Sequence, residues 1–456
     1  MHHRSPRHAR AVLVATLAVT VGLGLTPTLA HAEQADPSPA VGSAAAVPSS
    51  GSANARIARK IATRLAAPAL GRKVAVRVAG ASGGSAVFSK RAKVSMLPAS
   101  NMKLITAVNA MSAIGMDTRL PTTVVAEGAA GRKAVLVAGG DPVLTSRQLA
   151  GLARRSAKAL VGTLPDRKDR PAPRTVRLKT FFDDSLFSAP TSAPGWWTSY
   201  QPYVVRPVRA LVRDGRTAWD TSKDAFDYFS GVLRSKVDRM VADRTDLRVV
   251  VRARGRTSAP ADAPALARFK GNHLSSAVSW MLLVSDNNIA EMLYRMTAVA
   301  TGEPGSWQGG ARAAATVLGG LGVSTKGLVL ADGSGVSRND RVTAKSLIQL
   351  LRRAISPAHP ELARLRRLLP VSGVSGTLRA ANGRYTTAPS KCARGKISAK
   401  TGTLHDTVAL SGYTVGADGQ DRVFSILVNN RPEHRYSPLA TRRAVDTLAA
   451  TVTGCA

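Results

Sequence analysis

Ser100 and Lys103 form the only S-x-x-K sequence in the chain. On a helix, residues three apart lie on one face, so the lysine amine would lie near the serine hydroxyl. A serine hydroxyl becomes a nucleophile when a neighbouring base takes its proton, and a desolvated lysine with a lowered pKa can be that base. Free N–H groups at the helix start would favour the negative charge of acyl transfer. The pair predicts nucleophilic catalysis, and the simpler alternative is that Ser100 only caps a helix.

Two further motifs carry polar groups at unusual positions. Ser285-Asp286-Asn287 interrupts the apolar run WMLLVSDNNIAEML, and buried polar groups need partners. For Asp286 we favour a structural role. Lys400-Thr401-Gly402-Thr403 lies on a strand pattern, where Gly402 would let a substrate backbone approach closely. The alternative for Lys400 is a solvated lysine at a sheet edge.

S-x-x-K, S-D-N and K-T-G in this order are the motif set of β-lactamases and penicillin-binding proteins. From Arg56 onward the chain resembles the D-alanyl-D-alanine carboxypeptidase/endopeptidase family typified by penicillin-binding protein 4, peptidase family S13. With 185 positions between Ser100 and Ser285, the inserted domain of that family would be trimmed here. The stretches that carry the resemblance are Pro98–Lys103, Gly139–Pro142, Ser285–Asn288 with Ala290-Glu291, Asp332–Gly335 with Ser337-Arg338, Leu369–Gly373 with Gly376–Leu378, and Ala399–Leu404 with Leu410–Tyr413.

The resemblance implies a serine hydrolase that cleaves D-Ala-D-Ala ends or cross-links of peptidoglycan stem peptides through an acyl-enzyme. It implies acylation by β-lactams and no cofactor. Ser100 would attack the carbonyl of the penultimate D-alanine, Lys103 would accept its proton, and Ser285 would relay a proton to the departing D-alanine. Backbone N–H groups of Ser100 and Thr403 would form the oxyanion hole. Substrate binding and support of the proton network would fall to Asn287, Lys400, Thr401, Gly402 and Thr403.

The periodicity of apolar residues predicts an α+β fold with an antiparallel sheet flanked by helices. We expect a discontinuous peptidase domain over residues 56–116 and 260–456. An inserted domain over 117–259 would be mostly β, with strands near 122–128, 133–140, 174–184 and 246–255 and one helix near 146–160. The expected helices are 56–70, 100–114, 274–298, 307–320, 343–355, 361–369 and 438–452, and the expected strands of the peptidase domain are 73–80, 85–90, 396–404, 407–415 and 422–429.

The N-terminus predicts export. Arginines precede an apolar run, and Ala30-His31-Ala32 is typical of a signal-peptide cleavage site, so residues 1–32 would be removed. An uncleaved anchor is the alternative, but about 15 apolar residues fall short of the roughly 20 that span a bilayer. Residues 33–55 are rich in Ala, Ser, Pro and Gly and predict a disordered linker. The protein would be secreted or associated with the cell envelope.

The chain has a net charge of +36, and loss of three arginines with the signal peptide leaves +33. Export favours anionic wall polymers or the membrane surface as partners over nucleic acid. The charge is scattered, so a basic composition that serves solubility is an equal alternative. The sequence gives no indication of oligomeric state.

Other enzyme classes are poorly supported. Gly80-Ala81-Ser82-Gly83-Gly84 fits the G-x-S-x-G motif of α/β-hydrolases, which needs a helix after the serine, but a strand pattern follows. Four of the eight histidines lie in the signal peptide, and we expect His405 at the rim of the site. No H-E-x-x-H or paired-cysteine pattern predicts a metal. A wall-binding or antibiotic-sensing protein on this fold is disfavoured by the complete motifs, and a β-lactamase or esterase remains an alternative.

Cys392 and Cys455 are the only cysteines, and we expect them to form a disulfide bond. Export places them in an oxidising compartment, where an even count favours pairing. If the last three strands are antiparallel neighbours, the final helix returns toward the start of the first of them. Cys392 precedes that strand and Cys455 follows that helix. The alternative is two inert thiols.

Overall fold

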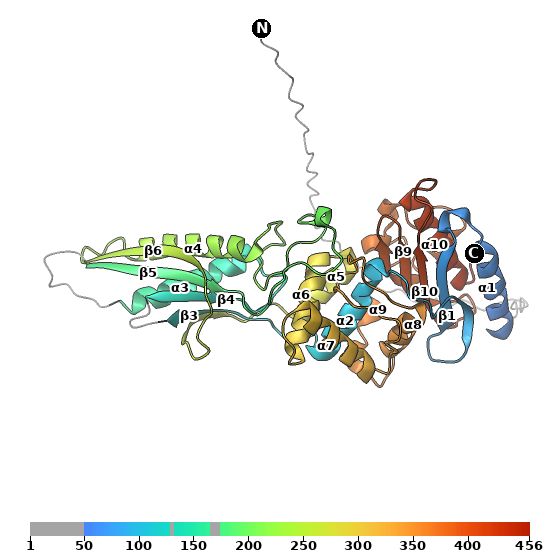
Figure 1. The fold of residues 1–456 in the computed structure, drawn as a ribbon, viewed down its shortest axis with the longest axis horizontal. Coiled ribbons are helices and arrows are strands. Elements are labelled where there is room, and N and C mark those ends of the chain that lie inside the picture. Colours follow the sequence, from blue (N-terminus) through green and yellow to red (C-terminus); the bar gives the residue numbers. More distant parts are fainter. Residues whose placement is uncertain (1–49, 128–131, 165–173) are drawn as a thin grey trace, which may run out of the picture. The chain divides into compact units, whose positions relative to one another are not determined.

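The first sheet has five antiparallel strands in the order β2-β1-β10-β9-β8 in the computed structural model (Figure 1). The structure describes residues 50–127, 132–164 and 174–456. Early strands pair directly with late ones, because β1 hydrogen-bonds to β10, and the K-T-G-T strand β8 forms one edge. The strands are β1 (Lys73–Gly80), β2 (Ala86–Lys90), β8 (Ile397–Thr403), β9 (Val408–Val415) and β10 (Asp421–Asn429).

Helices cover both faces of this sheet. Val74 of β1 belongs to the core beneath α1 (Ser50–Arg64) and α10 (Pro438–Val452), whereas the next residue, Ala75, faces the core on the other side. This follows from the alternation of side chains along a strand. The other helices of this region are α2 (Met102–Ala113), α5 (Leu274–Val284), α6 (Asn287–Ala300), α7 (Trp307–Gly320), α8 (Ala344–Arg353) and α9 (Leu365–Leu368). The predicted α+β fold is confirmed.

A second sheet lies within the inserted segment and has the order β6-β5-β4-β3-β7. It is mixed, because β5 runs parallel to both of its neighbours. Two helices, α3 (Ser146–Gly162) and α4 (Thr221–Met240), pack against it, and the rings of Phe182 and Phe226 are 4.8 Å apart. The strands are β3 (Thr122–Glu127), β4 (Lys133–Val137), β5 (Arg174–Asp183), β6 (Leu247–Arg256) and β7 (Ala265–Phe269).

The helix content of this segment differs from the prediction, because it contains two helices rather than one. The expected sheet is present, and it also includes β7, which lies past residue 259. The sequence did contain the signal for α4, since Phe226, Phe229, Leu233 and Val237 are buried at helical spacing. The four strands expected from the sequence, β3 to β6, are all present.

Two other helix boundaries also differ from the prediction. The helix expected over 274–298 is broken at Ser285, whose φ of +64° is left-handed, and Asp286 then caps α6 by accepting a hydrogen bond from the Ile289 N–H at 2.9 Å. Helix α1 begins at Ser50, so residues 50–55 are helical rather than part of a disordered linker.

The predicted signal peptide and residues 33–49 lie outside the described residues. Among the described residues, no helix combines the length and apolarity needed to cross a membrane.

Short 3-10 turns join several of these elements, and one of them carries Cys392. In the structure Cys392 is bonded to Cys455, with Cα atoms 6.0 Å apart, so the end of α10 is tied to the chain just before β8. The segment expected as a helix over 361–369 is a 3-10 turn followed by the one-turn α9. The 3-10 turns are η1 (Pro68–Leu70), η2 (Ala99–Asn101), η4 (Thr198–Tyr200), η5 (Pro360–Leu362), η6 (Gly376–Leu378), η7 (Ala380–Asn382) and η8 (Ser390–Ala393).

Candidate active site

Ser100 lies in the 3-10 turn η2, which leads directly into α2. The turn is entered through Ala99, a non-glycine residue with a positive φ of +45°. One helical turn later, the Lys103 amine lies 3.1 Å from the Ser100 hydroxyl. Serine and lysine are therefore in hydrogen-bonding contact through local helix geometry, as their spacing predicts.

Lys103 is fully buried and has two further hydrogen-bond acceptors. Its amine donates to Asn287 Oδ1 at 2.7 Å and to the Ser334 carbonyl at 2.9 Å. Burial lowers the pKa of Lys103 to about 8. Nearby carboxylates oppose this lowering, and Glu291 opposes it most. With this pKa about a tenth of the amine is neutral at pH 7, far more than for an ordinary lysine, which suits it to accept a proton from Ser100.

Three fully buried carboxylates, those of Glu291, Asp332 and Asp340, lie near Lys103. Glu291 accepts hydrogen bonds from the N–H groups of Gly333 and Ser334 at 2.8 and 3.0 Å. Burial, with a smaller effect of Asp332, raises the pKa of Glu291 well above its usual value. The sequence motifs predict no role for these residues. A glutamate within the apolar helix α6 was the signal that could have revealed them.

A second serine and lysine pair is formed by Ser285 and Lys400. The Lys400 amine donates to the Ser285 hydroxyl at 2.9 Å and to the Thr401 carbonyl at 3.0 Å. Ser285 occupies the left-handed break between α5 and α6 and belongs to neither helix. Burial lowers the pKa of Lys400 well below its usual value, and the nearby Lys103 adds to this. Lys400 is thus not the solvated edge lysine of the simpler alternative.

The other residues of β8 differ in their surroundings. Thr401 is buried and its hydroxyl lies 2.8 Å from that of Thr377, whereas Thr403 is exposed. A side chain at Gly402 would meet the Pro98 carbonyl at 2.9 Å and Ala99 at 3.1 Å. The glycine is therefore required for packing of β8 against the turn before Ser100, a reason that differs from the expected approach of substrate. The Asn101 amide also donates to the Lys400 carbonyl at 3.1 Å and joins the two motifs.

His405 follows β8 and takes no part in either pair. Its ring lies 5.0 Å from that of Trp197, and 42% of its side chain is exposed. Beside it, Arg338 donates to both oxygens of Asp406 at 2.8 and 2.7 Å. These residues form an aromatic and charged surface next to Thr403, in keeping with the expected rim position of His405.

The G-x-S-x-G sequence does not form a nucleophile site. Ser82 lies in the turn between strands β1 and β2, with no helix after it. A cavity of about 820 Å³ lies beside this turn, and its lining contains no residue of the S-x-x-K, S-D-N or K-T-G motifs.

A family model described as the D-Ala-D-Ala carboxypeptidase 3 (S13) family matches residues 57–226 and 249–452. Among curated proteins, Carboxypeptidase DacB of Mycolicibacterium smegmatis is 31% identical over 462 residues, which span 98% of this chain and 96% of that protein. The D-alanyl-D-alanine carboxypeptidase of an Actinomadura species is 29% identical, spanning 96% of this chain and 89% of that protein.

Among solved structures, penicillin-binding protein 4 (dacB) from Haemophilus influenzae matches with a TM-score of 0.67. The match has 19% sequence identity and covers 87% of this chain and 98% of that one. At this identity the likeness concerns the fold, and it extends over both sheets because nearly the whole of the matched chain is covered.

Proposed function

The chain belongs to the D-Ala-D-Ala carboxypeptidase S13 family, and from this we propose that Ser100 is the nucleophile with which it cleaves peptidoglycan stem peptides. The enzyme is a serine peptidase that is also acylated by β-lactams. The observation that carries the assignment of Ser100 is its 3.1 Å contact with a buried lysine amine whose pKa is lowered. Ser285, the other motif serine, precedes helix α6, whose N-terminus is already capped by the Asp286 carboxylate.

In the first step the neutral Lys103 amine removes the Ser100 proton while the serine oxygen attacks the carbonyl of the penultimate D-alanine. Asn287 Oδ1 and the Ser334 carbonyl already accept hydrogen bonds from this amine and would stabilise the ammonium that forms. The carbonyl oxygen becomes an oxyanion, held by the N–H groups of Ser100 and Thr403. Each such donor contributes about 3 kcal/mol in comparable sites.

In the second step the C–N bond breaks and the leaving D-alanine nitrogen gains a proton. We assign the donation to Ser285, whose hydroxyl lies 2.9 Å from the Lys400 amine and can be reprotonated by it. The substrate's terminal carboxylate would lie against Thr401 and Thr403, close to Lys400. Its negative charge would favour the ammonium form of Lys400, and this ammonium supplies the proton through Ser285 while Lys103 keeps the proton taken from Ser100. When water attacks the acyl-enzyme, the neutral Lys400 accepts its proton through Ser285, and Lys103 returns its proton to the Ser100 oxygen as the ester bond breaks.

We also propose the division of the chain into domains. The first sheet and its helices form a discontinuous peptidase domain, and the second sheet with α3 and α4 forms the inserted domain. Residues 1–32 would be a signal peptide that exports the enzyme to the cell envelope or beyond. N-terminal sequencing of protein recovered from the culture medium or wall should begin at Glu33, and retention of Met1 would refute this export route.

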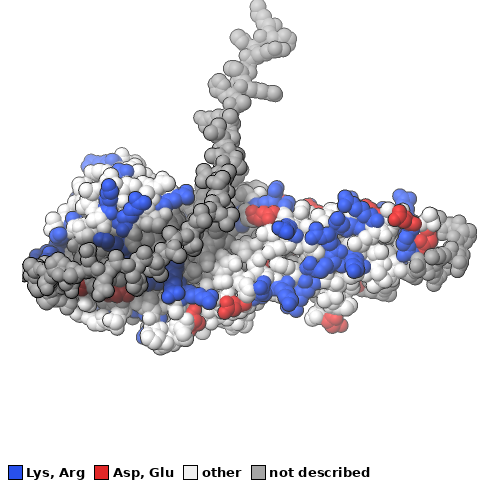
Figure 2. Space-filling view, turned by 180° about the vertical axis from the view of Figure 1, so that it is seen from behind, with Lys and Arg blue, Asp and Glu red and all other residues white. Residues whose placement is uncertain are grey.

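We propose anionic wall polymers as a further partner. One face of the molecule carries many more lysine and arginine side chains than acidic ones (Figure 2). Helix α3 exposes four cations and contains no acidic residue. They are Arg147, Arg154, Arg155 and Lys158.

Retention of the enzyme on immobilised teichoic acid tests this partner. Binding should weaken as salt screens the charges, and replacement of the four α3 cations by glutamine should weaken it further. Vesicles of anionic lipid test the membrane surface as the other source of negative charge. Equal retention of the variant and the parent on teichoic acid would exclude α3 as the contact surface.

Product analysis tests the activity itself. Purified enzyme is incubated with a stem pentapeptide ending in D-Ala-D-Ala and, separately, with cross-linked peptidoglycan. We expect one equivalent of free D-alanine from the pentapeptide, and release of monomeric stem peptides would add an endopeptidase activity. Rapid turnover of penicillin without release of D-alanine would instead identify a β-lactamase.

A further inference from the structure

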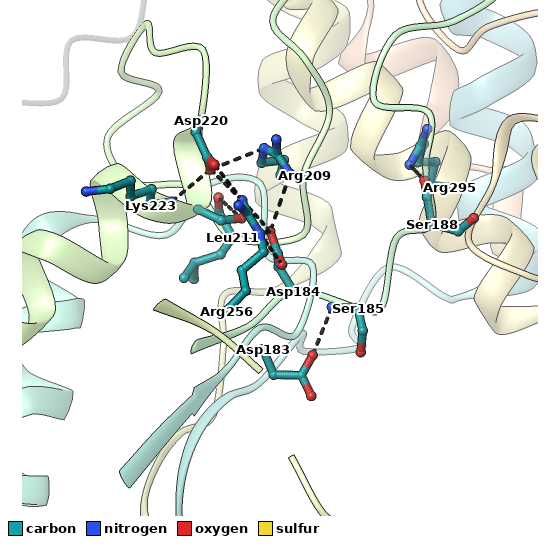
Figure 3. Close-up of polar contacts among 11 residues, drawn as sticks. Asp183, Asp184, Ser185, Ser188, Arg209, Leu211, Asp220, Lys223, Arg256 and Arg295 are labelled. Atoms are coloured by element: carbon teal, nitrogen blue, oxygen red, sulfur yellow. Dashed lines mark hydrogen bonds and ion pairs between the residues drawn. The ribbon is translucent and has the colours of Figure 1, made fainter. Parts of the chain in front are cut away.

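A long connection runs from the end of β5 to the start of α4, residues 184–220, here called the connecting segment. Its two ends are tied together by arginines (Figure 3). Arg256 of β6 contacts Asp184 at 3.0 Å and Asp220 at 2.6 Å. Arg209 lies within 3.2 Å of Asp220 and 3.8 Å of Asp184. The segment therefore leaves and rejoins the inserted domain at one charged cluster.

Between those ends the segment is bound to the helices of the peptidase domain. The buried Arg295 of α6 donates to the Ser188 carbonyl at 2.8 Å, as Figure 3 shows. The Trp307 indole of α7 donates to the Pro190 carbonyl at 2.9 Å, and the Arg295 guanidinium stacks on its ring at 4.1 Å. These contacts hold the start of the segment against the helices that surround α2.

The segment next joins the loop of residues 332–338, here called the Asp332 loop. The Trp196 indole N–H donates to Asp332 Oδ2 at 2.8 Å. The Arg338 N–H donates to the Gly195 carbonyl at 3.0 Å, and the Ser337 hydroxyl donates to the carbonyl of the preceding proline at 2.6 Å. Asp332 and Ser337 are fully buried, so these bonds are shielded from water.

The Asp332 loop contacts Lys103 through the Ser334 carbonyl. The other oxygen of Asp332 accepts hydrogen bonds from the N–H groups of Ser334 and Gly335 at 3.1 and 2.6 Å. The Gly335 N–H and the Ser334 carbonyl belong to one peptide group, so Asp332 fixes the carbonyl that accepts a hydrogen bond from Lys103. A side chain at Gly335 would lie 1.9 Å from the Ala99 carbonyl, so this loop also abuts the turn before Ser100. Trp196 is thus two hydrogen bonds away from the acceptor of the lysine amine.

The second acceptor of Lys103 is also oriented by the connecting segment. The Asn287 amide nitrogen donates to the Val204 carbonyl at 2.8 Å. An amide has one acceptor oxygen and one donor nitrogen, so this bond directs Oδ1 of Asn287 toward Lys103. The backbone N–H of Arg206 donates to Asn288 at 2.8 Å and extends the same attachment. The two acceptors of the lysine amine other than Ser100 both depend on one segment of the inserted domain.

We propose that the connecting segment holds the general base in place, and that Trp196 is a positioning residue that acts on Lys103 through Asp332 and Ser334. The proposal rests on the assignment of Lys103 as the base for Ser100. It gives the inserted domain a role in the chemistry besides any role in binding the wall. The segment would act by keeping both acceptors at the distance that stabilises the ammonium formed during attack on the substrate.

The effect should be visible in the pH dependence of acylation, because the two acceptors favour the charged form of Lys103. The charged groups that face Lys103 come from α6, its preceding turn, residues 332–340 and β8. They are Glu291, Asp286, Asp332, Asp340 and Lys400. Weaker hydrogen bonds from Lys103 to Asn287 and to the Ser334 carbonyl would leave these charges in place. They would favour the neutral form of the Lys103 amine over the charged form.

The test compares Trp196→Phe with Trp219→Phe. Phenylalanine keeps a ring against Trp307, whose centroid lies 5.4 Å from that of Trp196, but removes the indole N–H. Trp219 belongs to the same segment and is 59% exposed, so its replacement is a matched control. We expect the second-order rate constant for acylation by penicillin to fall on the order of tenfold in Trp196→Phe, consistent with loss of a hydrogen bond to a charged group. The midpoint of its pH profile should move to lower pH, and the control should match the parent.

Identical rates and midpoints in the two variants would overturn the proposal. If Trp196→Phe does not fold, as judged by circular dichroism, Ser337→Ala replaces it, because it removes an uncharged hydrogen bond between the connecting segment and the Asp332 loop. An unchanged rate and midpoint in that variant would overturn the proposal equally. Labelling of Ser100 in the parent is measured on the same samples. Its absence would refute the nucleophile assignment, whereas labelling with no effect of the variants refutes only the role of the connecting segment.

Discussion

The two serine and lysine pairs have similar contacts but different origins. Ser100 and Lys103 are three residues apart on one helix, with 3.1 Å between hydroxyl and amine. Ser285 and Lys400 are 115 residues apart, on a helix break and a sheet edge, with 2.9 Å between the same groups. Local helix geometry suffices for the first pair, whereas the second exists only when β8 packs beside the break between α5 and α6. The first contact therefore forms locally, whereas the second requires the whole fold.

The pairs also differ in electrostatics. Three buried carboxylates lie near Lys103 and hold its pKa at about 8 despite full burial. For Lys400, no carboxylate among the described residues opposes the lowering of the pKa by burial, and Lys103 lowers that pKa further. Two nearby buried amines disfavour being charged together. We infer that Lys103 exchanges a proton with Ser100, and that Lys400 gains positive charge mainly when the substrate carboxylate arrives.

Replacing Lys103 should have the largest effect of the lysine changes. Lys103→Ala removes the base, and we expect the rate constant for acylation of Ser100 by penicillin to fall by about 10² to 10⁴, the usual contribution of general base catalysis. Stopped-flow or quenched labelling measures this rate. An acylation rate equal to that of the parent would show that Lys103 is not the base for Ser100.

Replacing Lys400 should have a smaller and more selective effect. Lys400→Ala should reduce kcat/KM for a peptide with a free terminal carboxylate on the order of tenfold to a hundredfold, because a charge-assisted contact is lost. The same peptide with a C-terminal amide lacks the negative charge and should be affected much less. Equal losses on both peptides would argue that Lys400 does not recognise the carboxylate.

The pH dependence of acylation follows from the state of Lys103. Only the neutral amine accepts a proton, so the rate should rise with pH up to the pKa of about 8 and level off above it. Below that midpoint the rate should fall about tenfold per pH unit. Acylation rates of the parent between pH 5.5 and pH 10 test this, and a rate that decreases as pH rises through 8 would mean that the charged lysine is the active form.

The disulfide should affect stability and leave both pairs intact. We propose that Cys392 and Cys455 are bonded in the exported enzyme, and Cys392→Ser should lower the free energy of unfolding by up to about 4 kcal/mol in the chain-entropy model. Denaturant unfolding of variant and parent measures the difference, with acylation rates at 25 °C expected to agree. Two free thiols titrated in the unreduced, denatured parent would exclude the bond.

The parts of the site that follow from local spacing could be predicted from the sequence. The contact of Ser100 with Lys103 needs only a helix, and the antiparallel arrangement of the last three strands follows from the short connections between them. The roles of Glu291 and Asp332 could not be predicted, because their importance comes from burial beside Lys103, which tertiary packing creates. The connecting segment has no hydrophobic period, so nothing in its sequence indicates that Trp196 and Val204 reach the site.

Locating the penicillin adduct tests the central claim most directly. The parent enzyme is labelled to completion, digested and analysed by mass spectrometry, with Ser100→Ala and Ser285→Ala treated in parallel. We expect the adduct on the peptide that contains Ser100, no adduct in Ser100→Ala, and slower but intact labelling of Ser100 in Ser285→Ala. An adduct on Ser285, or labelling that survives in Ser100→Ala, would contradict the assignment of the two pairs.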